Sequence, residues 1–200
     1  MTRQHNSKET RELIISSAIQ NFIEKGYSKT TLEDITKRVG LTRGAFYWNF
    51  ECKKDILDEI VNRYERFYLD IYDRYEVFES AYETIRSLLI KDITKKSNPS
   101  PYMVIIRYKV EISTEITDVM NRQRKLDDLF ISIIEREIRR GIENCEFRRN
   151  LDAHEATIFI FTYLLGFDSY MVVHHTTEGD AHLTKENIES KVELVLKSLS

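Results

Sequence analysis

The sequence predicts an all-α protein in which a small helix-turn-helix domain precedes a larger helical domain. Its 200 residues include only six Gly and two Pro, with 42% hydrophobic and 32% charged residues. This composition suits a helical globular chain better than a β-sandwich or a disordered one. The length permits two domains, and we place the boundary after residue 54, giving domains at 1–54 and 55–200.

Three helices are predicted in the first domain. Apolar residues recur at helical spacing from residue 9 to residue 25. Thr30 and Thr31 each have an acidic residue three positions later, so two overlapping capping-box patterns open a second helix that Gly40 ends. Thr42 can cap a third helix that runs through Phe50.

A long fourth helix is predicted from Lys53 to about Phe78, so it starts just before the domain boundary. The one marked break is Lys95–Pro101, whose two prolines cannot continue a helix and separate two helices of the second domain. About nine helices are expected in all. Those after the break are predicted at 102–116, 119–145, 152–175 and 184–199.

Charge is distributed unevenly along the chain. Residues 1–54 carry ten Lys and Arg against six Asp and Glu, whereas residues 55–200 carry twenty against twenty-seven. A basic N-terminal part on an acidic body is expected where only one end meets phosphate. We expect a cytoplasmic protein for three reasons. The two cysteines are far apart in the sequence, the chain starts without a signal peptide, and no apolar run is long enough to cross a bilayer.

The residues of the predicted helix-turn-helix resemble the signature of the TetR family of transcriptional regulators. The matching segments are Thr-Thr-Leu-Glu-Asp-Ile at 30–35, Val-Gly-Leu-Thr-Arg-Gly at 39–44, Phe-Tyr-Trp-Asn-Phe at 46–50, and Lys53. The resemblance covers about residues 9–60. One departure is Asn49, which stands where histidine is usual in the family.

The resemblance implies that the chain contacts operator DNA through eight residues. Thr31, Tyr47 and Lys53 are expected at phosphates, and Arg43 is the candidate for reading guanine bidentately. A solvated Arg43 without a base partner is the alternative. The full expected set is Thr31, Thr42, Arg43, Gly44, Tyr47, Trp48, Asn49 and Lys53.

Three aromatic residues of the third helix have different expected roles. Phe46 and Phe50 are predicted to pack in the domain core. Trp48 has two open interpretations, because an amphipathic indole can touch the sugar-phosphate backbone or close the domain against the first helix.

A second copy of the chain is the expected cover for the segment 152–175. This helix is apolar nearly all round, so both of its sides need covering, although an internal core is the alternative. The resemblance implies that the last two helices form a four-helix dimer interface. The residues expected there are Phe161, Leu165, Tyr170, Val192, Val195, Leu196 and Leu199.

An aromatic run after Tyr64 predicts a pocket for a small hydrophobic or aromatic effector. Aromatic rings at helical spacing are also typical of ordinary core, so the two interpretations stay open. The residues expected to line the pocket are Phe67, Tyr68, Tyr72, Met103, Ile106, Arg107, Glu111 and Tyr163.

The sequence thus predicts a ligand-responsive repressor that binds palindromic operator DNA as a homodimer. The alternative within this fold is control by a protein partner instead of a small molecule. An enzyme or metal-binding bundle is disfavoured, because we find no Gly-rich phosphate loop, no nucleophile elbow and no spaced Cys and His ligands. No cofactor is expected.

Overall fold

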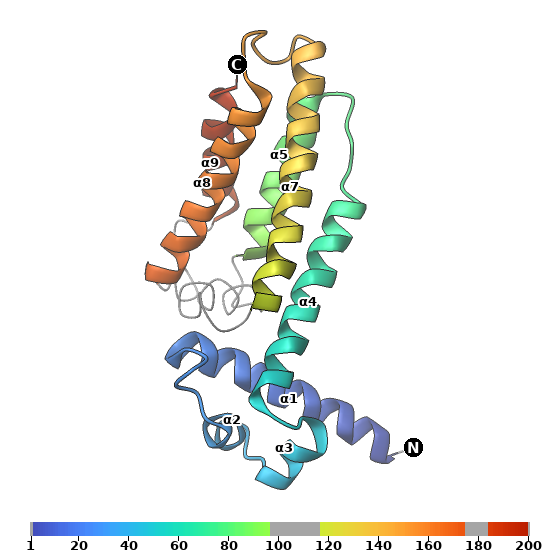
Figure 1. Cartoon of the computed structure of the whole chain (residues 1–200), viewed down its shortest axis with the longest axis vertical. Coiled ribbons are helices and arrows are strands. Elements are labelled where there is room, and N and C mark those ends of the chain that lie inside the picture. The colour runs from blue at the N-terminus through green and yellow to red at the C-terminus, as the bar shows by residue number, and fades with distance from the viewer. Residues whose placement is uncertain (1, 97–116, 175–183, 200) are drawn as a thin grey trace. The chain divides into compact units, whose positions relative to one another are not determined.

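The computed structural model describes residues 2–96, 117–174 and 184–199, which form eight α-helices and no β-strand (Figure 1). The predicted all-α class is confirmed. The described residues divide into two compact units, residues 2–66 with 117–119 and residues 67–96 with 120–174 and 184–199. The helix predicted at 102–116 lies outside the described residues.

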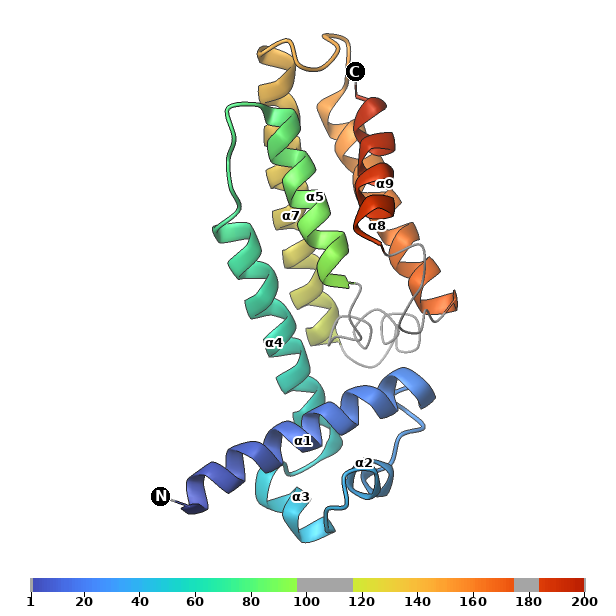
Figure 2. The same ribbon diagram turned by 180° about the vertical axis from the view of Figure 1, so that it is seen from behind.

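The first unit holds α1 (Thr2–Lys25), α2 (Leu32–Arg38), α3 (Arg43–Asn49) and the beginning of α4 (Lys53–Asp73). Helix α1 contacts both α2 and α3 (Figure 2). Each fully buried apolar side chain stabilises such a core by roughly 1.5–3 kcal/mol. The core side chains are Ile14, Ile15, Ala18, Phe22, Ile35, Phe46, Phe50, Ile56, Leu57 and Ile60.

Two glycines make the turns of this unit. Gly26 ends α1 at φ 83° and donates its amide to the Phe22 carbonyl, and Gly40 follows α2 at φ 66°. Both values lie in the left-handed region, which costs a glycine little and other residues more. The main difference from the sequence prediction is that α1 begins at Thr2 instead of Glu9.

The second unit holds the end of α4 with α5 (Ala81–Lys96), α7 (Thr117–Glu143), α8 (Ala153–His174) and α9 (Lys185–Lys197). Helix α9 packs on α5 (Figure 2). Glu193 of α9 joins the two helices, because it accepts hydrogen bonds from the Tyr82 hydroxyl and, at 2.7 Å, from Arg86 Nε.

Helix α4 ends at Asp73, so the predicted extension to Phe78 is wrong. Backbone groups beyond the helix find partners six and 62 residues away in the sequence. The Phe78 amide donates to Thr84 Oγ1 at 2.9 Å, and Arg140 Nη1 donates to the Phe78 carbonyl at 3.0 Å. These contacts satisfy the backbone in a non-helical path that no local pattern reveals.

Helix α8 buries one face, which includes Ile160 and Leu164, and exposes Phe159 and Tyr170 on others. In the three described ranges, no helix is both long enough and apolar enough to cross a membrane.

Candidate nucleic-acid interface

The second helix of the first unit begins with the capping box that the sequence predicts. The Asp34 amide donates to Thr31 Oγ1 at 3.1 Å, and the Thr31 amide donates to Asp34 Oδ2 at 2.9 Å. The Lys25 ammonium lies 2.6 Å from Asp34 and, with the Thr31 donors, holds the pKa of this carboxyl well below its usual range. Thr31 is exposed, but its hydroxyl also donates to Asp34 at 2.8 Å.

Helix α3 begins at the predicted cap. Thr42 Oγ1 accepts from the Ala45 amide at 3.1 Å, and Phe46 and Phe50 are buried as predicted. The other side of α3 faces solvent, where Arg43 and Gly44 are exposed at its first turn. Gly44 has open space beside it, since a Cβ built there would meet only Thr42 Oγ1, at 3.8 Å.

Trp48 is 83% exposed and Tyr47 is 57% exposed. An indole that closed the unit against α1 would be buried, so the structure disfavours that interpretation of Trp48. Adjacent exposed aromatic side chains are a common feature of interaction surfaces. Asn49 differs from them, because its amide donates to the Ala45 carbonyl of its own helix at 2.8 Å.

Arg43 has a carboxylate neighbour on α2. Its Nη2 lies 3.5 Å from Glu33 Oε2, and both side chains are 71% exposed. A surface pair of this kind is weak and leaves the guanidinium able to exchange its partner. Arg43 can therefore reach another acceptor from the start of α3.

The two short helices are held by contacts from α1 that the sequence analysis missed. Arg11 of α1 donates to the Asn49 carbonyl at 2.8 Å and stacks over the Phe50 ring at 4.2 Å. Ser17 of α1 donates to the Ile35 carbonyl at 2.7 Å. The acceptors are backbone carbonyls at the ends of α3 and within α2, and no sequence motif marks them.

Lys53, which is expected at phosphate, has partners within the chain. Its ammonium is turned inward and donates to the carbonyls of Tyr27 at 2.6 Å and Thr30 at 2.8 Å. It also lies 4.3 Å from the centre of the Tyr27 ring. Burial without a carboxylate partner lowers the pKa of Lys53.

The fold and this solvent-facing helix define a helix-turn-helix DNA-binding regulator. The family model "Bacterial regulatory proteins, tetR family" matches residues 14–60. The HTH-type transcriptional regulator AcrR of Shigella flexneri is 29% identical over 168 residues, which are 82% of this chain and 78% of that protein. The chain belongs to the TetR family of transcriptional regulators.

Two further proteins show how similarity is distributed along the chain. The HTH-type transcriptional repressor BepR of Brucella suis is 47% identical over 55 residues, covering 28% of this chain and 26% of that protein. A structure titled "SmeT-Triclosan complex" matches 95% of this chain and 91% of its own, with a TM-score of 0.69 and 24% identity. Sequence identity is therefore higher over a short stretch, whereas the fold is shared over nearly the whole chain.

The predicted effector residues fall into three groups. Tyr68 and Tyr72 are buried, Phe67 is partly exposed, and burial raises the pKa of the half-buried Tyr163. Their neighbours form a series of rings, in which Tyr72 lies 5.9 Å from Phe130. The remaining four lie outside the described residues: Met103, Ile106, Arg107 and Glu111.

The expected dimer residues on α9 need correction. Val192, Val195, Leu196 and Leu199 are each at most 4% exposed within the single chain. Their stripe is part of the chain's own core, and a partner has no surface left to cover there. On α8, Leu165 and Tyr170 are exposed as an interface requires, whereas Phe161 is half-buried and stacks with Phe130 at 6.2 Å.

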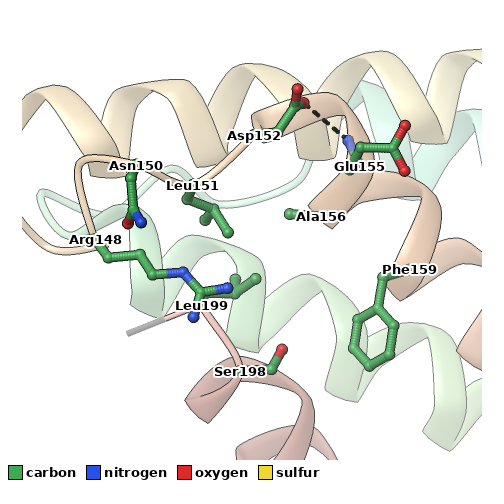
Figure 3. A pocket seen from close by; sticks show the side chains of 9 residues that line it. All are labelled: Arg148, Asn150, Leu151, Asp152, Glu155, Ala156, Phe159, Ser198 and Leu199. Carbon is green, nitrogen blue, oxygen red and sulfur yellow. Dashed lines mark hydrogen bonds between the residues drawn. The ribbon is translucent and has the colours of Figure 1, made fainter.

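A pocket of about 420 Å³ that the sequence did not indicate lies in the second unit (Figure 3). Its walls come from the 148–152 loop, the first turns of α8 and the end of α9, and Asp152 accepts from the Glu155 amide at 3.1 Å. It shares no residue with the aromatic set above. Within the described ranges, no group of three His, Cys, Asp or Glu could hold a metal ion.

Proposed function

We propose that this transcriptional regulator is a repressor that reads operator DNA through α3. The observation that carries the proposal is the solvent-facing side of α3, where Arg43, Gly44, Tyr47 and Trp48 are exposed on a helix whose other side is buried. Such a surface fits the major groove, with Arg43 at a base edge and Tyr47 and Trp48 at the sugar-phosphate backbone. The similarity to a repressor over 55 residues supports the direction of regulation.

We propose that the regulator binds as a homodimer, which would match a two-fold operator and would cover exposed apolar surface. Exposed Phe159, Leu165 and Tyr170 on α8 and Leu194 on α9 are the residues we now assign to the interface. Two copies would place two α3 helices about one DNA turn apart. Leu165→Lys is expected to shift the sedimenting species from dimer to monomer. Leu13→Lys, a similarly exposed leucine on α1, should leave the dimer intact.

The operator test compares two arginines matched in exposure and in pairing. Arg43→Ala is expected to weaken binding to the duplex upstream of the chain's own gene about 5- to 150-fold and to relax sequence preference. Arg74→Ala is the control, because Arg74 is 77% exposed and paired with Asp70 in the other unit. Equal binding by both variants in a gel-shift titration would overturn the assignment of α3.

Release by a small aromatic effector is the third part of the proposal. The ring series of Tyr68, Tyr72, Phe130 and Phe161 provides apolar, polarisable surface inside the second unit. Triclosan is a suitable probe, because it is bound in a structure with the same fold. We expect it to raise the melting temperature and weaken operator binding. If it does neither, the alternative of a controlling protein partner is favoured.

A further inference from the structure

Lys53 begins α4, yet its ammonium is placed in the turn between α1 and α2. Nζ donates to the carbonyls of Tyr27 at 2.6 Å and Thr30 at 2.8 Å, and it lies 3.4 Å from the Ser28 carbonyl. An ammonium has three N–H donors, and three turn carbonyls surround this one. The Tyr27 ring covers it from one side.

This turn needs an outside donor. Its carbonyls follow the end of α1, where helical hydrogen bonding stops, so they depend on other partners. The turn closes on itself only in part, through the Thr30 amide donating to the Tyr27 carbonyl at 3.3 Å. The buried Thr30 hydroxyl ties it to α1 by donating to the Gly26 carbonyl at 2.7 Å. Lys53 supplies the link from the turn to α4.

The turn leads directly into the helix-turn-helix. Thr31, the next residue after the carbonyls that Lys53 holds, is the N-cap of α2. The position of Thr31 fixes where α2 begins, and α2 in turn contacts α3. Loss of the Lys53 ammonium would therefore loosen the start of the reading motif without removing any group that faces solvent on α3.

We propose that Lys53 is a positioning residue for DNA reading, one that holds residues 27–30 and so sets the place of Thr31 and α2, instead of contacting phosphate itself. The inference rests on the proposed function. It differs from the family-based expectation in a measurable way, because a phosphate contact depends on charge, whereas this role depends on the geometry of the three carbonyl contacts.

Lys53→Arg separates the two roles, because it keeps the charge but presents a planar fork in place of three tetrahedral donors. The positioning role predicts about tenfold weaker binding to the upstream duplex, since fewer molecules hold the binding-competent turn. It also predicts faster amide hydrogen exchange at residues 28–32 in the free protein. A phosphate contact predicts affinity close to wild type and unchanged exchange, and that result would overturn the inference.

Lys53→Met gives the complementary test. This substitution removes the charge. If Lys53 contacts a phosphate, the slope of log K for DNA binding against log salt concentration should become shallower by about 0.9. If Lys53 is a positioning residue, binding should weaken while the slope stays unchanged. Lys29→Met is the control, because it removes an exposed lysine of the same turn and should leave amide exchange as in wild type. Should Lys53→Met fail to fold, Lys53→Arg alone decides.

Failure of the wild-type chain to bind the upstream duplex would contradict the proposed function itself. A wrong Lys53 inference would give another result: the wild-type chain would bind the upstream duplex, and Lys53→Arg would bind it equally well.

Discussion

Gly44→Ala is expected to separate folding of the first unit from DNA binding. Gly44 is the second residue of α3, and an added Cβ would meet only Thr42 Oγ1, at 3.8 Å. This distance is an ordinary van der Waals contact. The free protein therefore offers no steric reason for glycine at this position.

The effect on stability should be small and favourable. Alanine is better than glycine in a helix interior by about 1 kcal/mol, and less so near a helix end. For a chain of this size about 1 kcal/mol corresponds to roughly 2–4 °C in melting temperature. We therefore expect the melting temperature of the free Gly44→Ala protein, followed by circular dichroism, to be unchanged or raised within that range.

The effect on DNA binding should have the opposite sign. Beside Gly44 the α3 backbone is bare, which lets the helix start approach the floor of the major groove. A methyl group there holds the helix away and should cost about 1–3 kcal/mol, the size of a mismatched base pair, or about 5- to 150-fold in affinity. Fluorescence anisotropy with the upstream duplex measures this loss. Wild-type affinity in a stable Gly44→Ala protein would refute the docking of α3.

Three further predictions concern the second unit. Gly141→Ala should lower stability by about 1–3 kcal/mol in thermal or urea unfolding, because its Cβ would lie 2.3 Å from the Phe147 ring; unchanged stability would show that the ring moves freely. A Cβ added at Gly166 would meet no atom within 4 Å in the single chain, so Gly166→Ala should leave the fold intact. It should raise the dimer dissociation constant measured by sedimentation. An unaltered dissociation constant would exclude a close approach of a partner helix at Gly166. The hydrogen bond between His154 and Glu135 raises the pKa of His154 and lowers the pKa of Glu135. The contribution of this hydrogen bond to stability should decrease as pH rises through the raised pKa of His154, and also as pH falls through the lowered pKa of Glu135. In an NMR titration Glu135→Gln should return the His154 pKa toward its ordinary value, and an unchanged pKa would contradict the contact.

Local patterns predicted the helix-turn-helix well because its determinants are local. The capping box needs only Thr31 and Asp34, three residues apart, and both of its hydrogen bonds are present. The burial of Phe46 and Phe50 follows from helical spacing within one short segment. Such features depend on nearest neighbours along the chain, so sequence reasoning reaches them.

Partners distant in sequence explain what local patterns did not predict. The positive charge of Lys53 can be read from the sequence. Its hydrogen bonds to the carbonyls of Tyr27 and Thr30 cannot, because these residues lie more than twenty positions away. The apolar stripe that includes Val192 and Leu196 was recognised correctly as buried, yet periodicity does not tell whether α5 or a second copy covers it. Deciding between the two requires the tertiary fold.

The most direct test of the central claim uses Trp48, the one tryptophan in the chain. Because this side chain is exposed on α3, its fluorescence should change when the upstream duplex binds. We predict a change that saturates at two chains per duplex and a midpoint that rises steeply with salt. Emission that stays constant while the duplex is bound, or saturation at one chain per duplex, would contradict reading of a two-fold operator by α3.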